Sequence, residues 1–152
     1  MKPLIINKRA RYEYQPLTTF LAGVVLQGPE VKMLRQKKGS LSGSYVRIIN
    51  DEPVLLNAQI PPYPYARQDD YDPKQTRKLL LSKKEILRLK EAQQEKGKAL
   101  IPLAFGLQGK FIKLELAIAR GKSQFDKRET IRRRDLDRQT ARDLKLKIGW
   151  IG

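Results

Sequence analysis

The stretch FIKLELAIA, residues 111–119, alternates large apolar side chains with charged ones. Its large apolar side chains occupy the even positions from Ile112 to Ile118, and Lys113 and Glu115 lie between them. Successive side chains of a β-strand point to opposite faces of the sheet, so this alternation predicts a strand with one buried face and one solvated face. We therefore expect a β-sheet at the centre of the fold.

Apolar runs on the N-terminal side of this segment predict further strands. They are LAGVVLQ (21–27), YVRII (45–49), VLLNAQI (54–60) and ALIPLAF (99–105). Short connections rich in turn-forming residues separate two pairs of these segments, which predicts hairpins at 50–53 and 106–110. Hairpins join antiparallel neighbours, so the predicted sheet is antiparallel.

Two helices are predicted between the strands. The first, PEVKMLRQKK (29–38), opens with a proline and a glutamate, which suit the first helical turn, and stops at Gly39. The second begins at Ser82, with Glu85 three residues later as a capping box, and ends at Gly97. Glu30, in the first of these helices, is expected to cap its own helix.

These elements predict a mainly β protein with inserted helices. Residues 61–75 hold four prolines and three tyrosines and are expected to form a loop. About five or six short antiparallel strands with helices at the corners favour a small closed barrel, and the OB-fold is a barrel of this kind that binds nucleic acids. We assign the OB-like barrel to residues 1–119, which hold nearly all the long apolar side chains.

Residues 120–152 have a different composition. They contain eleven Lys and Arg against five Asp and Glu, with few large apolar side chains between them. This is too little apolar surface to fold alone. We expect a basic C-terminal tail that is disordered when free and becomes helical once RNA phosphates offset its self-repulsion.

The charge of the whole chain indicates a polyanionic partner. Its 152 residues include 32 Lys and Arg against 16 Asp and Glu, a formal net charge of +16. Nucleic acid suits such a protein because each neutralised phosphate releases counterions. The alternative is a basic protein that is merely soluble.

The chain contains neither Cys nor His. This excludes thiolate and imidazole chemistry and the usual zinc sites, so we expect no enzyme activity, no cofactor and no metal. The acidic loop residues Asp69, Asp70 and Asp72 are expected to be a solvated cluster rather than a Mg²⁺ site. The apolar run at residues 4–6 is too short for a signal peptide, so a cytoplasmic protein is expected.

Four collinear segments resemble the SmpB family. They are NKRARYEY (7–14), LAGVVLQGPEVKMLR (21–35), DPKQTRKLLLSKKEI (72–86) and ARGKSQFDKRETIRRRD (119–135). The resemblance implies an OB-type barrel that binds the tRNA-like domain of transfer-messenger RNA and helps elongation factor Tu deliver it to stalled ribosomes. It also implies a tail that lies in the empty mRNA channel while the nascent chain is tagged.

The resemblance also assigns site residues. Those expected to bind transfer-messenger RNA are Asn7, Lys8, Arg9, Arg11, Tyr12, Arg77 and Lys78. Those expected in the hinge and in the tail at the decoding centre of the ribosome are Gly121, Lys122, Phe125, Asp126, Lys127, Arg128, Arg132, Arg133 and Arg134. The segment 7–11 has a second interpretation as a solvated arm.

Two tyrosines and two departures from the family pattern bear on these contacts. Tyr12 and Tyr14 are expected to share one face of a strand, where they either stack on a base or pack in the barrel. Leu21 stands where many SmpB proteins have an acidic residue, and it cannot accept a hydrogen bond from RNA. Phe125 stands where most have His, and its ring keeps a face for stacking on a base.

Two other classes of protein remain open. A basic ribosomal protein or ribosome-assembly factor would share the charge and the barrel. A nuclease or RNA-modifying enzyme would need a carboxylate–metal or Lys/Tyr mechanism, and no predicted strand carries clustered carboxylates to support one.

Overall fold

A computed structural model of the chain describes residues 1–67, 69–122, 128, 131, 132 and 134. The chain divides into two compact units, Met1–Gly121 and Lys122–Gly152. In chain order, the elements of the first unit are β1 (Lys2–Ile6), α1 (Lys8–Glu13), β2 (Tyr14–Val24), α2 (Gly28–Arg35), β3 (Tyr45–Ile49), β4 (Glu52–Leu56), β5 (Arg77–Leu80), α3 (Lys83–Gln94), β6 (Lys98–Gln108) and β7 (Phe111–Gly121).

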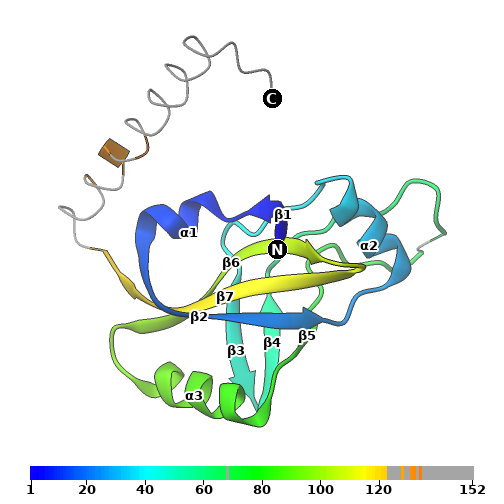
Figure 1. Ribbon diagram of the computed structural model, residues 1–152. Helices are drawn as coiled ribbons and strands as arrows, with labels where there is room; N and C mark the ends of the chain where they lie inside the picture. The colour runs from blue at the N-terminus through cyan, green and yellow to red at the C-terminus, as the bar shows by residue number, and fades with distance from the viewer. Residues whose placement is uncertain (68, 123–127, 129–130, 133, 135–152) are drawn as a thin grey trace. The chain divides into compact units, whose positions relative to one another are not determined.

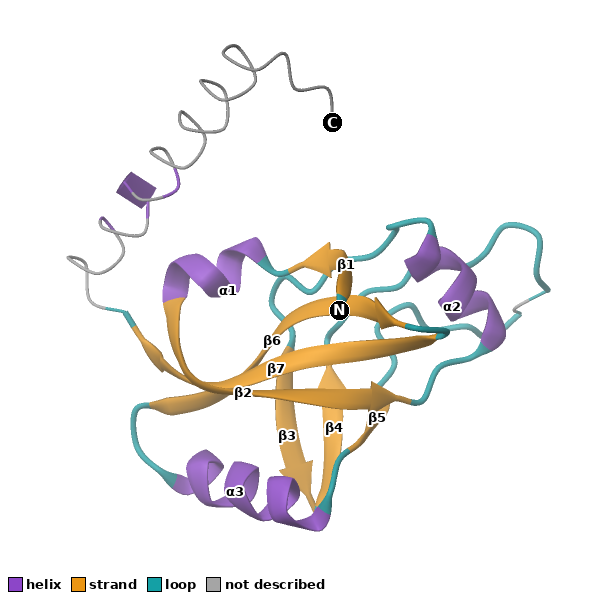
Figure 2. Ribbon diagram, in the orientation of Figure 1, coloured by secondary structure: helices purple, strands orange, loops and turns teal. Residues whose placement is uncertain are grey.

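The seven strands form one antiparallel sheet in the order β1-β6-β7-β2-β5-β4-β3. The long strands β2, β6 and β7 run together through the centre of the unit, and the short strands β3 and β4 run across them (Figure 1). Helix α3 lies at the lower ends of β3 and β4, and α1 and α2 lie at the opposite side of the sheet (Figure 2). The prediction of a mainly β fold with inserted helices is therefore confirmed.

The sheet is open, so the predicted closed barrel is wrong. Strands β1 and β3 are its two ends, and neither is hydrogen-bonded to a second strand among those described. At the β3 end, the Gln93 side chain of α3 accepts a hydrogen bond from the Ile48 amide at 2.7 Å and donates one to the Ile48 carbonyl at 3.2 Å. This side chain satisfies backbone groups that a closing strand would otherwise use, and it covers an edge that could pair with another chain.

The first predicted hairpin is tighter than the sequence suggested. Ile49 pairs with Glu52, so only Asn50 and Asp51 form the turn, and both have positive φ, as a type I′ turn requires. Pro53, predicted to lie in the turn, is buried in β4 opposite Ile48. The backbone N–H and C=O of Ile48, opposite this proline, bond to the Gln93 side chain of α3, so Ile48 does not need a donor from Pro53.

The second predicted hairpin is also confirmed with a shorter turn, because β6 extends to Gln108 and only residues 109 and 110 separate it from β7. Three prolines mark the irregular points of the long strands. The pairing register shifts directly after Pro3 in β1, Pro16 in β2 and Pro102 in β6. Proline cannot donate to the ladder, and a bulge accommodates that loss.

The main core lies on one face of the sheet. The alternate residues predicted from the sequence, Ile112 to Ile118 on β7, all belong to it, and Leu114 and Leu116 are fully buried. The opposite face is only partly solvated, because α1 covers Ala117 and Ala119 and places Ala10 against them. The expectation of one wholly wet face is wrong at this end of the strand.

The predicted helices are confirmed with changed ends. α3 has the capping box at Ser82 and Glu85 and buries Leu89. α2 ends at Arg35 rather than at residue 38, because Lys37 adopts a positive φ of 60° that ends the helix before Gly39. Its capping box places the Glu30 carboxylate on the Gln27 amide at 2.9 Å, as predicted for a capping glutamate.

The N-terminal segment is more structured than its sequence suggested. β1 pairs with β6, and α1 takes the place of the strand expected around Tyr12 and Tyr14. Tyr12 therefore lies on a helix and Tyr14 begins β2, so the two do not share a strand face.

In the second unit, the described residues Arg128, Ile131, Arg132 and Arg134 are helical. Phe125, Asp126, Lys127 and Arg133 lie outside the described residues. No helix among the described residues is long and apolar enough to cross a membrane.

Candidate RNA-binding surface

Asn7 holds α1 against the sheet. Its Oδ1 accepts from the Ala10 amide at 3.1 Å, which caps the helix. Its Nδ2 donates to the carbonyls of Leu41 at 3.2 Å and Pro102 at 2.8 Å. The residue is only 4% exposed, so its amide is used inside the protein. The predicted contact of Asn7 with RNA stays a prediction, and this burial gives it no support.

The cations that follow Asn7 are on the surface of α1. Lys8, Arg9 and Arg11 are all exposed, and Arg9 Nε lies 3.1 Å from Glu13 Oε1. An exposed pair at i and i+4 contributes only about 0.3–0.5 kcal/mol to stability. Little is therefore lost if Arg9 exchanges its carboxylate for a ligand, and the helix presents three cations to solvent.

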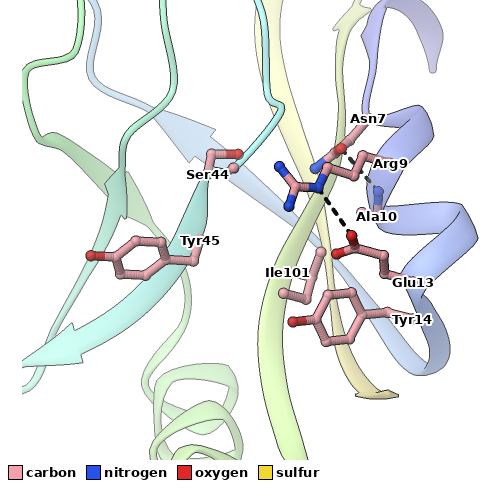
Figure 3. A pocket seen from close by; sticks show the side chains of 9 residues that line it. Asn7, Arg9, Ala10, Glu13, Tyr14, Ser44, Tyr45 and Ile101 are labelled. Carbon is pink, nitrogen blue, oxygen red and sulfur yellow. Dashed lines mark hydrogen bonds and ion pairs between the residues drawn. The ribbon is translucent and has the colours of Figure 1, made fainter. Parts of the chain in front are cut away.

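A cavity of about 300 Å³ opens beside these cations. The α1 side of the cavity carries Arg9, Glu13 and Tyr14, and the opposite side carries Ser44 and Tyr45 at the start of β3 (Figure 3). Its other lining residues are Asn7, Ala10, Gly43 and Ile101. The sequence alone did not indicate this cavity, because it depends on a helix at residues 8–13 that was not predicted.

A second cavity, of about 320 Å³, has both Asn7 and its hydrogen-bond partner Leu41 in its wall. Both cavities include Asn7 and Arg9 in their walls. Lys8, Ser40 and Ser42 also line the second one. A cationic helix beside two hollows that contain polar side chains suits a folded RNA, which proteins recognise by shape, phosphate contacts and unpaired bases.

Arg77 is buried in an ion pair with Glu30. Both side chains are 1% exposed, and Arg77 Nη2 lies 2.6 Å from Glu30 Oε2. Arg77 also donates to the carbonyls of Ala58 at 2.7 Å, Gln75 at 3.0 Å and Pro73 at 3.0 Å. The guanidinium thus joins β5 to α2 and to the loop that precedes β5. The predicted RNA contact of Arg77 stays a prediction that this burial does not support.

The pKa values of Tyr71 and Glu30 are shifted within this cluster. Burial raises the pKa of Tyr71 to about 12, and the Glu30 charge acts in the same direction. Burial alone would raise the pKa of Glu30, but the hydrogen bonds from Gln27, Arg77 and Gln75 and the charge of Arg77 outweigh it and lower that pKa. Glu30 is therefore ionised and Tyr71 neutral at physiological pH, which is the pairing that Arg77 requires.

Lys78 and Tyr12 are placed differently from Arg77. The Lys78 side chain is 54% exposed, and its Nζ lies 3.9 Å from Glu52 Oε1. Such a long exposed pair leaves the ammonium available to a phosphate. Tyr12 is half-buried on α1. Of the predicted contacts, Lys8, Arg9 and Arg11 come together on α1, whereas Lys78 lies on β5.

The remaining predicted residues lie at the end of β7 and beyond it. Gly121 is the last residue of β7, pairs with Tyr14 and is exposed. Arg128 and Arg132 are exposed, and Arg134 is half-buried. Within the described part of the chain, no three Asp, Glu, His or Cys side chains come together as metal ligands.

Comparison with known proteins gives one consistent result. The family model described as SmpB protein matches residues 4–146. The SsrA-binding protein of Pelotomaculum thermopropionicum is 47% identical over 148 residues, 97% of each chain. That of Chlorobium luteolum is 50% identical over 135 residues, 88% of this chain and 86% of the relative. A solved structure described as "tmRNA-SmpB: a journey to the center of the bacterial ribosome" matches with a TM-score of 0.67 and 39% identity, covering 86% of this chain and 96% of its own.

Proposed function

Because the chain belongs to the SmpB family, we propose that it binds transfer-messenger RNA and acts in trans-translation, the rescue of stalled ribosomes. The observation that carries this proposal is the near full-length similarity to SsrA-binding proteins, at 47% identity over 97% of both chains. The matching solved structure, described as tmRNA-SmpB, names this RNA together with an SmpB protein. The formal charge of +16 supports a large RNA partner.

The contacts with the tRNA-like domain are proposed for the exposed side chains of the first unit. Lys8, Arg11 and Lys78 reach phosphates, Arg9 adds a further cationic contact with the RNA, and Tyr12 adds an aromatic edge. Asn7 and Arg77 support RNA binding indirectly, because Asn7 holds α1 in place and Arg77 holds the start of β5 in place. Phosphate contacts position a protein on RNA and supply most of the affinity.

The second unit is proposed to act on the ribosome. Residues 1–119 with the end of β7 form the RNA-binding body, and the basic segment that follows enters the empty mRNA channel. Gly121 and Lys122 form the hinge, and Phe125 to Arg134 approach the decoding centre, where Phe125 stacks on a ribosomal base. Elongation factor Tu joins the delivery complex, and the site of action is the cytoplasm.

A pair of double variants tests the body of this proposal. Lys8→Ala with Arg11→Ala removes two charges from α1, and Lys83→Ala with Lys84→Ala removes two exposed charges from α3. We expect the α1 variant to lose about tenfold or more in affinity for the isolated tRNA-like domain, because lost phosphate contacts forfeit counterion release. The α3 variant should lose much less. Equal losses would mean that general charge, and not the α1 surface, carries binding.

A further inference from the structure

The cavity beside α1 is lined by polar and apolar groups in similar measure. Ala10 and Ile101 are buried residues that contribute apolar surface, and the ring of Tyr14 points toward the β3 side (Figure 3). Ligand sites likewise combine apolar or aromatic surface with a few polar groups that fix the ligand's orientation. Its volume of about 300 Å³ is at the small end of the usual range for such sites.

The polar groups on its α1 side form a donor beside an acceptor. Arg9 Nε lies 3.1 Å from Glu13 Oε1, and the Glu13 side chain is 35% exposed. The remaining guanidinium N–H groups and the second carboxylate oxygen have hydrogen-bonding capacity beyond this single bond. A flat ligand that enters the cavity edge-first meets donor and acceptor side by side.

We propose that this cavity captures one unpaired guanine base of an RNA. The inference rests on the proposed function, since it takes the partner to be RNA. The base stacks on Tyr14, Glu13 accepts from its N1–H and N2–H groups, and Arg9 donates to O6. Unpaired RNA bases are recognised in this way, by aromatic stacking and by hydrogen bonds to their Watson–Crick edges.

The count of hydrogen bonds favours guanine over the other bases. Guanine offers two adjacent N–H donors to the carboxylate and one acceptor to the guanidinium. Adenine, cytosine and uracil each offer only one donor group, beside at least one acceptor. Hydrogen bonds to a charged group are the stronger kind, so the extra contact to Glu13 gives the discrimination. Lys8 and Arg11 on the same helix are near enough in sequence to hold the flanking phosphates.

Mononucleotides test the cavity directly on the full chain. We expect GMP to shift the backbone amide signals of Gly43, Ser44 and Ile101 in NMR titrations, with an affinity order GMP, then IMP, then AMP. IMP lacks only the N2 amino group and isolates that contact. Signals of the β6–β7 turn should not move. Equal shifts by all three nucleotides, or none in the cavity, would overturn the proposal.

Glu13→Gln separates base recognition from charge. It raises the net charge of the protein by one, so a purely electrostatic role predicts tighter RNA binding. The proposal predicts instead about tenfold weaker binding and loss of the GMP preference over AMP. The glutamine amide has only one acceptor oxygen, so it cannot accept from both N1–H and N2–H of guanine as the two carboxylate oxygens can. Glu91→Gln, an exposed glutamate on α3, is the matched control and should not weaken binding.

Tyr14→Leu tests the stacking face while keeping an apolar side chain against the sheet. It should weaken RNA binding about tenfold, whereas Tyr65→Leu, at an 88% exposed loop tyrosine, should not. The guanine belongs to transfer-messenger RNA if both cavity variants lose affinity for the tRNA-like domain. It belongs to ribosomal RNA if they lose affinity only for the small ribosomal subunit. If neither affinity falls while the parent protein binds the tRNA-like domain, the cavity proposal fails and the proposed function stands.

Discussion

The ion pair of Arg77 and Glu30 is the most demanding electrostatic feature of the first unit. Both charges are removed from water, which costs several kcal/mol per ion unless partners compensate. Here Glu30 accepts from Gln27, Gln75 and Arg77, and Arg77 donates to three backbone carbonyls besides. The described residues contain no buried side-chain polar atom without a partner. The cluster therefore specifies how α2, β5 and the loop 61–76 fit together.

Glu30→Gln should destabilise the protein strongly. The amide leaves Arg77 as a buried charge without its counter-ion, and breaking such pairs typically costs about 3–5 kcal/mol. The measurement is the free energy of unfolding in urea at neutral pH. Glu52→Gln makes the same change in the exposed pair with Lys78 and should cost at most about 1 kcal/mol. Similar losses in the two variants would show that burial of the first pair does not matter.

The lowered pKa of Glu30 predicts how this difference depends on pH. The folded pKa is below the ordinary value of 4.5, so the unfolded state takes up the proton first as the pH falls. The stabilisation is complete above about pH 4.5 and is lost as the pH falls through the folded pKa. The stability difference between the parent protein and Glu30→Gln should therefore shrink below that pH. A difference that stays constant from pH 7 to pH 3 would contradict the assigned shift.

The roles of single residues were predictable from the sequence where they depend on close sequence neighbours. The capping glutamate and the capping box at Ser82 follow from neighbours three residues apart in the sequence. The burial of Arg77 was not predictable, because its partner Glu30 is 47 residues away and on another element. The burial of Asn7 depends on carbonyls at residues 41 and 102 for the same reason.

At the level of elements, the strands with a clear apolar pattern were found, including the five-residue strands β3 and β4, whereas β1 and β5 were not. β7 shows four alternate apolar residues, whereas β5 spans only Arg77–Leu80 and β1 only Lys2–Ile6. Such short segments contain too little pattern to separate a strand from a loop. The contact of α3 with the β3 edge was not predictable either, because it joins Gln93 to Ile48, 45 residues apart in the sequence.

Ending the chain at Lys122 tests the division into body and tail. β7 ends at Gly121 and its pairing with β2 is complete by then, so the shortened protein should keep its stability. Its affinity for the isolated tRNA-like domain should stay within about threefold, a modest electrostatic loss from the missing cations. Tagging on stalled ribosomes in a purified reaction should be abolished. A shortened protein that is unfolded would show that the tail belongs to the core.

At the level of the whole molecule, charge is predicted to control affinity. If about six phosphates are contacted in the complex, the logarithm of affinity should fall against the logarithm of salt concentration with a slope of about −4 to −6. Filter binding or fluorescence anisotropy with the tRNA-like domain between 50 and 300 mM salt, roughly the range where this release dominates, gives that slope. The α1 double variant should reduce its magnitude by about 2. A flat response would exclude phosphate-dominated binding.

The central claim is that transfer-messenger RNA is the partner of this protein. The direct measurement is to purify the full chain from its native cells under mild salt conditions and to sequence all RNA that comes with it. We expect transfer-messenger RNA to dominate that pool, above messenger RNA and bulk transfer RNA, and the protein to associate with stalled rather than all ribosomes. A constant amount of the protein in every intact ribosome, with ribosomal RNA and no transfer-messenger RNA, would contradict the claim and indicate a ribosomal protein or assembly factor instead.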